Sequence, residues 1–202
     1  VVMGKGSNLL DSDAGLDGCV IVLGREFSRI EVLAEDNKIV AGAAVPLSRV
    51  VTAATKASMS GLEFACGIPG TLGGAVSMDA GTRREWIGRR IESLVVFRPG
   101  RGLMRVWGTD VEWGYRWTSL GGADIVLEAT LALDPGDRAE ITAQMEQLLA
   151  RRRATQPMGK PCCGSVFRNP PGDRGAAQLV EACGLKGYSS GGAQVSDVHA
   201  NF

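Results

Sequence analysis

Apolar and polar residues alternate along several stretches of the chain, which predicts β-strands. Residues 30–44 alternate on both sides of Glu35–Asn37, the pattern of a hairpin with an acidic turn. Residues 91–107 give a second hairpin signal around Pro99–Gly100, and residues 125–133 alternate again. The continuous apolar run Cys19–Gly24 is typical of a short buried strand.

Other stretches have the spacing of helices. Apolar residues recur at helical intervals from Leu47 to Ala57, and we expect Gly61 to end that helix. Asp137 can cap a second helix, at 138–152, whose apolar residues form one stripe. A shorter helical pattern begins at Ala176 and stops at Gly184. Hairpins and helices in this order predict an α+β fold.

The composition shifts to Gly, Pro, Ser and Cys beyond Gln156–Pro157, so we place a domain boundary near residue 154. The predicted units are residues 1–153 and residues 154–202, with the helix at 138–152 as the hinge. The chain begins with "VVMGKGSN", like the end of a buried strand, and stops at "VHANF". We therefore expect both ends to be cut from a longer chain.

Charge and cysteine content narrow the possible partners. The 22 basic and 22 acidic residues leave no net charge, so neither nucleic acid nor a membrane surface is an expected partner. No apolar run approaches the ~18 residues of a membrane span. Five cysteines without CxxC spacing and a single histidine, His199, argue against a zinc site or a disulfide framework. We expect a cytoplasmic monomer without metal, in which Cys162 and Cys163 pack rather than serve redox chemistry.

Two glycine-rich loops could bind an anion. In "GKGSN", Gly4 and Gly6 allow a tight turn that exposes N–H groups, and Ser7 and Asn8 add side-chain donors; a plain tight turn is an equal alternative. The stretch 67–75, "GIPGTLGGA", repeats this chemistry. Two such loops suit a pyrophosphate. Neither matches a Walker loop or a GxGxxG fingerprint.

Two further polar clusters could carry chemistry. Arg116 in "GYRWTSL" could stabilise charge on a carboxylate or enolate, or it could pair with a structural carboxylate. Ser165 in "CGSVFRNP" could transfer a proton, although no histidine stands nearby to make it a nucleophile. The run Arg151–Arg153 is equally consistent with a solvated helix end.

Taken in order, "GKGSNLL", "GLEFACGIPGTLGGAVSMDAG", "GYRWTS", "QPMGKPCCGSVFRNPP" and "AAQLVEACGLKGYSSGGAQVSDVHANF" make the chain resemble the UDP-N-acetylenolpyruvoylglucosamine reductase (MurB) family through essentially its whole length. The resemblance implies a two-lobed FAD-binding fold of the vanillyl-alcohol oxidase (PCMH) type, followed by a small α+β substrate-binding domain. It also implies NADPH-dependent reduction of UDP-N-acetylglucosamine enolpyruvate to UDP-N-acetylmuramate.

The resemblance assigns roles to individual residues. Arg116 and Ser165 match the family's charge-stabilising arginine and its proton donor, and Tyr115, Arg153 and Asn169 match substrate-contacting positions. The matches to FAD-binding positions are Gly4, Gly6, Ser7, Asn8, Leu9, Gly67, Ile68, Pro69, Gly70, Thr71, Gly73, Gly74, Ala75 and Asp79.

The chain also departs from the family. The family's third catalytic residue, a glutamate, would lie beyond Phe202, and Asp79 stands where the family usually has asparagine. Two alternatives to the reductase remain open: a flavin oxidase or dehydrogenase of the same superfamily, for which a proton donor such as Ser165 would be unnecessary, and an inactive nucleotide-binding fragment.

Overall fold

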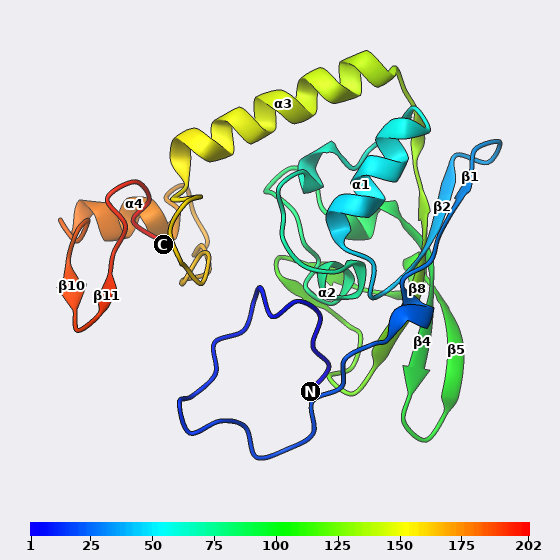
Figure 1. The fold of residues 1–202 in the computed structure, drawn as a ribbon, viewed down its shortest axis with the longest axis horizontal. Helices are drawn as coiled ribbons and strands as arrows, with labels where there is room; N and C mark the ends of the chain where they lie inside the picture. Colours follow the sequence, from blue (N-terminus) through cyan, green and yellow to red (C-terminus); the bar gives the residue numbers. More distant parts are fainter.

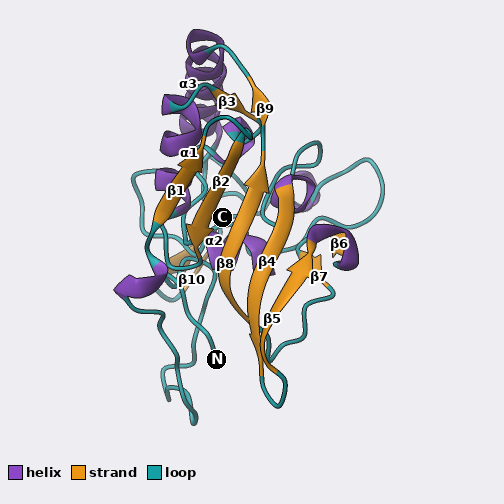
Figure 2. Ribbon diagram, turned by 90° about the vertical axis from the view of Figure 1, so that its right-hand side faces the viewer, coloured by secondary structure: helices purple, strands orange, loops and turns teal.

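A five-stranded antiparallel sheet forms the centre of the computed structural model, which describes residues 1–202. Figure 2 shows its strand order, β1-β2-β8-β4-β5. Both predicted hairpins are present, and β8, from much later in the chain, pairs with β2 on one side and β4 on the other. The strands are β1 (Ile30–Leu33), β2 (Lys38–Gly42), β4 (Ile91–Arg98), β5 (Gly102–Trp107) and β8 (Ile125–Ala132).

The sheet buries one face under helices. In β2 the side chains of Ile39 and Ala41 are buried, and in β4 those of Leu94 and Val96, in keeping with the two-residue period of a strand. Figure 1 shows two helices on this side of the sheet, α1 (Leu47–Lys56) and α2 (Leu72–Ser77). The core between these layers positions α2. The second glycine-rich loop leads into this helix, and Asp79 follows it.

The helix predicted after Pro46 forms, but it ends earlier than expected. Its buried residues Leu47, Val50, Val51 and Ala54 follow the predicted helical spacing. The chain leaves the helix through Ser58, which has a left-handed φ of 57°, because Met59 must enter β3 (Met59–Ser60). The expectation that Gly61 ends the helix is therefore wrong.

The predicted strand at Cys19–Gly24 is also wrong. Only one parallel bridge, between Val2 and Ile21, forms there, and Val20, Ile21 and Val22 are exposed. The five-stranded sheet does not extend to this segment, and of its apolar side chains Leu23 packs against the main core. Apolar content alone does not make a strand without a neighbouring strand to pair with.

The helix α3 (Arg138–Thr155) links the sheet to the C-terminal part of the chain (Figure 1). Asp137 caps it as predicted, because its Oδ1 accepts hydrogen bonds from the N–H groups of Ala139 and Glu140 at 2.8 and 3.0 Å. The main apolar core has no member beyond Leu133. The domain boundary near residue 154 stays a prediction.

The remaining elements are short. In the C-terminal part, Gly184 follows α4 with a left-handed φ of 70°, so the predicted stop is confirmed. None of the helices combines the length and apolar character that crossing a membrane requires. The short elements are α4 (Ala176–Ala182), β6 (Trp113–Gly114), β7 (Trp117–Thr118), β9 (Asp134–Pro135), β10 (Ser189–Ser190), β11 (Ala193–Gln194), η1 (Arg25–Phe27), η2 (Glu63–Ala65), η3 (Ile87–Arg90) and η4 (Gly108–Asp110).

Candidate functional site

The two glycine-rich loops lie against each other, although more than 50 positions separate them in the sequence. A Cβ atom added to Gly4 would lie 2.5 Å from Oγ1 of Thr71, and one added to Gly70 would lie 3.0 Å from Oγ of Ser7. Glycine is therefore required at Gly4 because the second loop occupies the space that a side chain would fill.

Several N–H groups in these loops have no acceptor within the protein. They belong to residues 4–8 in the first loop and to Gly67, Gly70 and Thr71 in the second. Unpaired N–H groups on adjoining loops form the donor set that an acceptor-only anion such as a diphosphate needs. The residues present therefore fit a diphosphate group.

The N–H groups at the end of the second loop are bonded within the protein, and the predicted FAD contacts of Gly73, Gly74 and Ala75 stay predictions. The N–H groups of Leu72 and Gly73 donate to the carbonyls of Val45 and Ala43, and the N–H of Gly74 donates to Oγ1 of Thr71. A Cβ on Gly73 would lie 2.8 Å from the Cβ of Ala43. Gly73 thus allows α2 to pack closely on the chain after β2, and its N–H is not free for a ligand.

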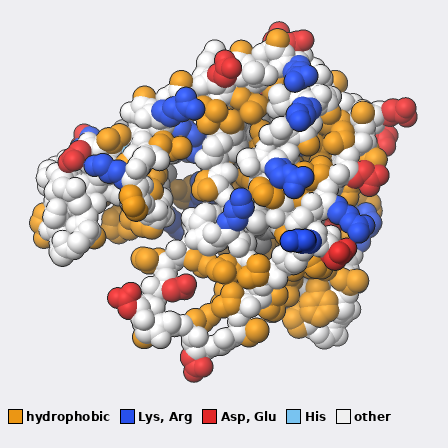
Figure 3. All heavy atoms as spheres, viewed as in Figure 1, with side chains coloured by type: hydrophobic (Ala, Val, Ile, Leu, Met, Phe, Trp, Pro, Cys, Tyr) orange, Lys and Arg blue, Asp and Glu red, His pale blue; other side chains and the backbone are white.

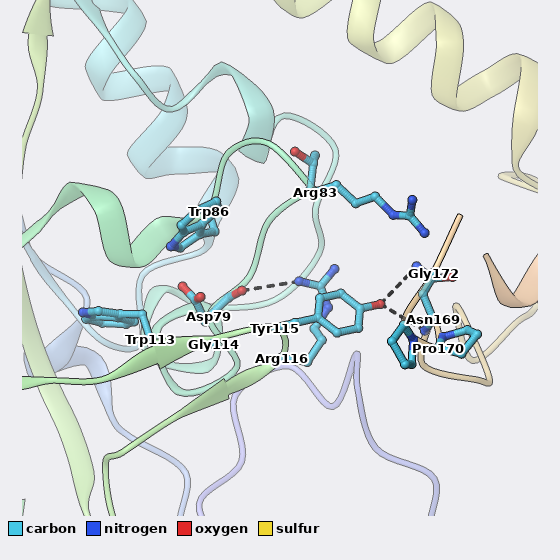
Figure 4. A pocket seen from close by; sticks show the side chains of 12 residues that line it. Asp79, Arg83, Trp86, Trp113, Gly114, Tyr115, Arg116, Asn169, Pro170 and Gly172 are labelled. Atoms are coloured by element: carbon cyan, nitrogen blue, oxygen red, sulfur yellow. Dashed lines mark hydrogen bonds between the residues drawn. The ribbon is translucent and has the colours of Figure 1, made fainter. Parts of the chain in front are cut away.

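A cavity of about 650 Å³ opens at the other end of α2. Its lining comes from the loop after α2, from the β6–β7 hairpin and from the C-terminal part of the chain, as Figure 4 shows. The space-filling view in Figure 3 shows a hollow between the C-terminal part and the main body. The lining residues are Asp79, Thr82, Arg83, Trp86, Trp113, Gly114, Tyr115, Arg116, Asn169, Pro170, Pro171 and Gly172.

Arg116 lies in the two-residue turn between β6 and β7 and has a left-handed φ of 58°. Its Nη1 donates to the carbonyl of Asp79 at 3.3 Å, and its Nη2 donates to the carbonyl of Gly81 at 2.9 Å. It forms no ion pair with a carboxylate. The alternative of a structural ion pair at Arg116 is therefore excluded, because no carboxylate lies within ion-pair distance of its guanidinium.

Asp79 is the buried acid of the cavity wall, with only 4% of its surface exposed and a left-handed φ of 40°. Its Oδ1 accepts a 3.0 Å hydrogen bond from the N–H of Gly88. Burial raises the pKa of the Asp79 carboxyl, while the Gly88 hydrogen bond and the charge of Arg116 act in the opposite direction. The predicted contact with flavin stays a prediction.

Tyr115 and Asn169 join the two parts of the chain across the cavity (Figure 4). The Oη atom of Tyr115 accepts hydrogen bonds from the N–H and Nδ2 of Asn169 at 3.4 and 3.2 Å. The Oδ1 atom of Asn169 accepts from the N–H of Ala176 at the start of α4. Two residues predicted to contact substrate are therefore brought together, and the C-terminal part is held near Arg116.

Ser165 lies outside the cavity lining, is exposed and has no hydrogen-bond partner. The predicted role of Ser165 as a proton donor stays a prediction. The residues after it are fixed, since the N–H groups of Val166 and Phe167 donate to the main-chain and side-chain oxygens of the buried Asn201. This pairing joins "GSVF" to the terminal "HANF".

The structure separates the members of the arginine run. Arg153 is exposed and its side chain forms no hydrogen bond or ion pair, so its predicted substrate contact stays a prediction. Arg152 is half-buried, and a Cβ on Gly67 would lie 3.2 Å from its Cδ. Burial lowers the pKa of Arg152, and the positive charge of Arg116 lowers it further. Sequence reasoning missed Arg152 because a helical run does not show which member faces inward.

Trp86 and Trp113 line the cavity, but the sequence did not predict them as site residues. Trp113 precedes Tyr115–Arg116 by two positions, and its Nε1 donates to the carbonyl of Gly108 at 2.9 Å. The guanidinium of Arg89 lies 3.8 Å from the ring centre of Trp86. The only sequence signal was the proximity of Trp113 to the turn.

Known proteins resemble the chain throughout. Residues 1–99 match the FAD binding domain family, and residues 156–202 match the C-terminal domain of UDP-N-acetylenolpyruvoylglucosamine reductase. The chain is 43% identical over its whole length to proteins of that name from Heliobacterium modesticaldum and Bacillus cereus, and it spans 64% and 66% of their lengths.

A solved structure agrees with these matches. The crystal structure of UDP-N-acetylenolpyruvylglucosamine reductase (MurB) from Thermus caldophilus superposes with a TM-score of 0.89 at 35% identity. The match covers all of this chain and 73% of that one. The expected α+β fold with an FAD-binding domain is confirmed. The chain belongs to the UDP-N-acetylenolpyruvoylglucosamine reductase (MurB) family.

Proposed function

We propose that this chain carries the FAD-binding and substrate-binding parts of an enzyme that reduces UDP-N-acetylglucosamine enolpyruvate to UDP-N-acetylmuramate in peptidoglycan synthesis, with NADPH as reductant. One observation carries the proposal. The guanidinium of Arg116 lines the cavity, is held by two main-chain carbonyls and has no carboxylate partner. Its positive charge is available to a bound anionic ligand.

The two adjoining loops would hold the cofactor. The unpaired N–H groups of residues 4–8 and of Gly67, Gly70 and Thr71 provide donors for the diphosphate of FAD. Bound FAD would supply the hydride chemistry that links NADPH to carbon C3 of the enolpyruvyl group. The helix α2 begins at the second loop and is followed directly by the cavity wall at Asp79. This one short helix therefore positions both the proposed diphosphate site and the cavity.

Arg116 would stabilise the charge that the reaction creates. Adding a hydride to C3 of the enolpyruvyl group leaves negative charge on C2 and on the attached carboxylate. A preorganised cation stabilises that charge without having to reorient, and a single such donor is typically worth about 10²–10³ in rate. The two carbonyl contacts of Arg116 provide this preorganisation.

Ser165 would then donate a proton to C2. A hydroxyl is a weak acid, but the carbanionic carbon is a strong base, so correct placement matters more than acidity. The contacts of Asn201 with Val166 and Phe167 support this role, because they fix the chain directly after Ser165. The Tyr115–Asn169 contact holds the same segment beside the turn that carries Arg116.

The proposal is tested in two stages. Flavin uptake is measured on this chain by absorbance and fluorescence titration with FAD. Turnover is measured in a polypeptide that contains this chain and has the length of its curated relatives. Under anaerobic conditions NADPH should bleach the flavin, and UDP-N-acetylglucosamine enolpyruvate, but not UDP-N-acetylglucosamine, should restore its absorbance. Failure to take up FAD, or a reduced flavin that the enolpyruvyl substrate does not reoxidise, would contradict the proposal.

A further inference from the structure

The segment from Asp79 to Gly88 is a closed loop whose ends are joined by one side chain. The Oδ1 atom of Asp79 accepts from the N–H of Gly88 at 3.0 Å. Within the loop, the N–H of Ile87 donates to the carbonyl of Ala80 at 3.0 Å, and Gly81 forms an antiparallel bridge with Trp86. The hydrogen bond of the Asp79 side chain therefore lies at the base of the loop and helps to hold its two ends together.

The same loop holds Arg116 through its main chain. The two acceptors for the Arg116 guanidinium are the carbonyls of Asp79 and Gly81, at 3.3 and 2.9 Å. The orientation of these carbonyls depends on the left-handed backbone at Asp79, a conformation that Asp and Asn adopt more readily than other residues with a side chain. A change in the loop would therefore move both acceptors of Arg116.

The hairpin that carries Arg116 also packs on the far end of the loop. A side chain added to Gly88 would collide with the indole ring of Trp113, which shows that this ring lies directly on the Gly88 backbone. Trp113 belongs to β6, three residues before Arg116. The β6–β7 hairpin thus contacts the loop at two places, through Arg116 at its first residues and through Trp113 at Gly88. The Asp79–Gly88 hydrogen bond connects these two places.

Arg116 has few other constraints. It is left-handed at φ 58°, which residues with a side chain rarely adopt, and it has no ion pair. Such a conformation persists only where surrounding contacts determine it. The turn between β6 and β7 accounts for this backbone, and the hydrogen bonds of the guanidinium go to the loop that Asp79 closes.

We propose that Asp79 is a positioning residue, whose side-chain oxygen holds the N–H of Gly88 and thereby fixes the two carbonyls that orient Arg116 toward an enolpyruvyl carboxylate. The proposal rests on the proposed function for the identity of the ligand. The role needs an acceptor oxygen and not a negative charge. An asparagine would therefore preserve it, and a residue without an acceptor would not.

The substitutions Asp79→Asn and Asp79→Gly separate these requirements. Asparagine keeps the acceptor, whereas glycine keeps the left-handed backbone but removes the acceptor. Asp137→Ala is the control, because it removes another aspartate that accepts main-chain hydrogen bonds, at the start of α3 and outside the cavity.

The kinetic test measures each half-reaction by rapid mixing in the polypeptide of the relatives' length. Reduction of bound flavin by NADPH should stay within about twofold in all variants, because Arg116 acts only on the enolpyruvyl substrate. Reoxidation by that substrate should fall by about tenfold or more in Asp79→Gly and stay near the original rate in Asp79→Asn and Asp137→Ala. Equal reoxidation rates in Asp79→Gly and the original protein would overturn the proposal, and so would an impaired Asp79→Asn.

A second measurement does not depend on FAD or turnover. Hydrogen exchange at the Gly88 amide should become faster in Asp79→Gly and remain slow in Asp79→Asn. Unchanged protection in Asp79→Gly would overturn the proposal even if the enzyme proved to act on another substrate. If Asp79→Gly does not fold, Asp79→Asn decides, because loss of reoxidation or of Gly88 protection in that folded variant contradicts the acceptor role.

Discussion

The guanidinium of Arg116 donates a 3.3 Å hydrogen bond to the main-chain carbonyl of Asp79, a residue 37 positions earlier in the chain. Both residues have left-handed backbone conformations. The contact places the guanidinium of Arg116, which has no ion pair, and the buried carboxyl of Asp79 in the wall of the same cavity. The chemistry of the site therefore depends on how the loop after α2 meets the β6–β7 turn.

Asp79→Asn should increase stability at neutral pH. Burial raises the pKa of Asp79 in the folded protein, so the unfolded chain loses this proton first as the pH rises, and the free energy of unfolding falls until the folded carboxyl has also ionised. Asparagine does not titrate. Urea unfolding between about pH 4 and pH 8 should show the advantage of the variant growing with pH, and a constant difference would contradict the assignment.

Asp124→Asn should have the opposite pH dependence. Two hydrogen bonds from Arg98, at 2.6 and 2.8 Å, hold the pKa of the Asp124 carboxyl below its usual range. The carboxylate therefore stabilises the folded protein above the pKa that it has in the unfolded chain, and this contribution is lost as the pH falls through the folded pKa. The variant should unfold at lower urea concentration at neutral pH and match the original protein in acid.

Gly73→Ala should destabilise the protein by about 1–3 kcal/mol, because the added methyl would overpack α2 against the chain after β2. The clash is with the Cβ of Ala43, at 2.8 Å. The matched control is Gly74→Ala in the same helix, where the added Cβ would lie 3.6 Å from Oγ1 of Thr71. The control should be neutral or more stable by about 0.5–1 kcal/mol in chemical denaturation without FAD. Equal effects would show that Gly73 is not a packing contact.

Gly4→Ala should weaken FAD binding by about tenfold or more, because it would push apart the loops whose N–H groups are proposed to hold the diphosphate. The added Cβ would lie 2.5 Å from Oγ1 and 3.3 Å from Cγ2 of Thr71, and moving Oγ1 away would disturb the hydrogen bond that it accepts from the N–H of Gly74. Gly24→Ala is the control, since nothing lies within 4 Å of its added Cβ. Fluorescence titration gives the affinity of each variant for FAD. Unchanged FAD binding by Gly4→Ala would argue against a diphosphate site formed by both loops.

Ser165→Ala should leave the reduction of bound flavin by NADPH intact and abolish most product formation, because only the second half-reaction needs a proton at C2. Ser165 is exposed and has no hydrogen-bond partner, so the change should not alter stability. Rapid mixing of each half-reaction is the measurement. Loss of both half-reactions together, with a lower melting temperature, would instead indicate a folding defect.

The amino-acid sequence determined the local elements and the residue types of the site. Period-two and helical patterns gave both hairpins, β8, α1 and α3, because strand and helix geometry place neighbouring side chains at fixed intervals. The pattern failed at Cys19–Gly24, where no sheet strand lies alongside, and at Gly61, where the path into β3 ends the helix earlier. Pairing partners lie far away in the sequence, so a local pattern does not contain them.

Only the tertiary structure decided what each functional group faces. The sequence showed that Arg116 is charged, but the fold gave it carbonyl partners instead of a carboxylate. The sequence also showed two glycine-rich loops. In the fold, Gly73 allows close packing, while the N–H groups of Gly70 and Thr71 have no acceptor in the protein. Residue type fixes which interactions a group can make, and which of them it makes depends on contacts between segments that only the folded chain brings together.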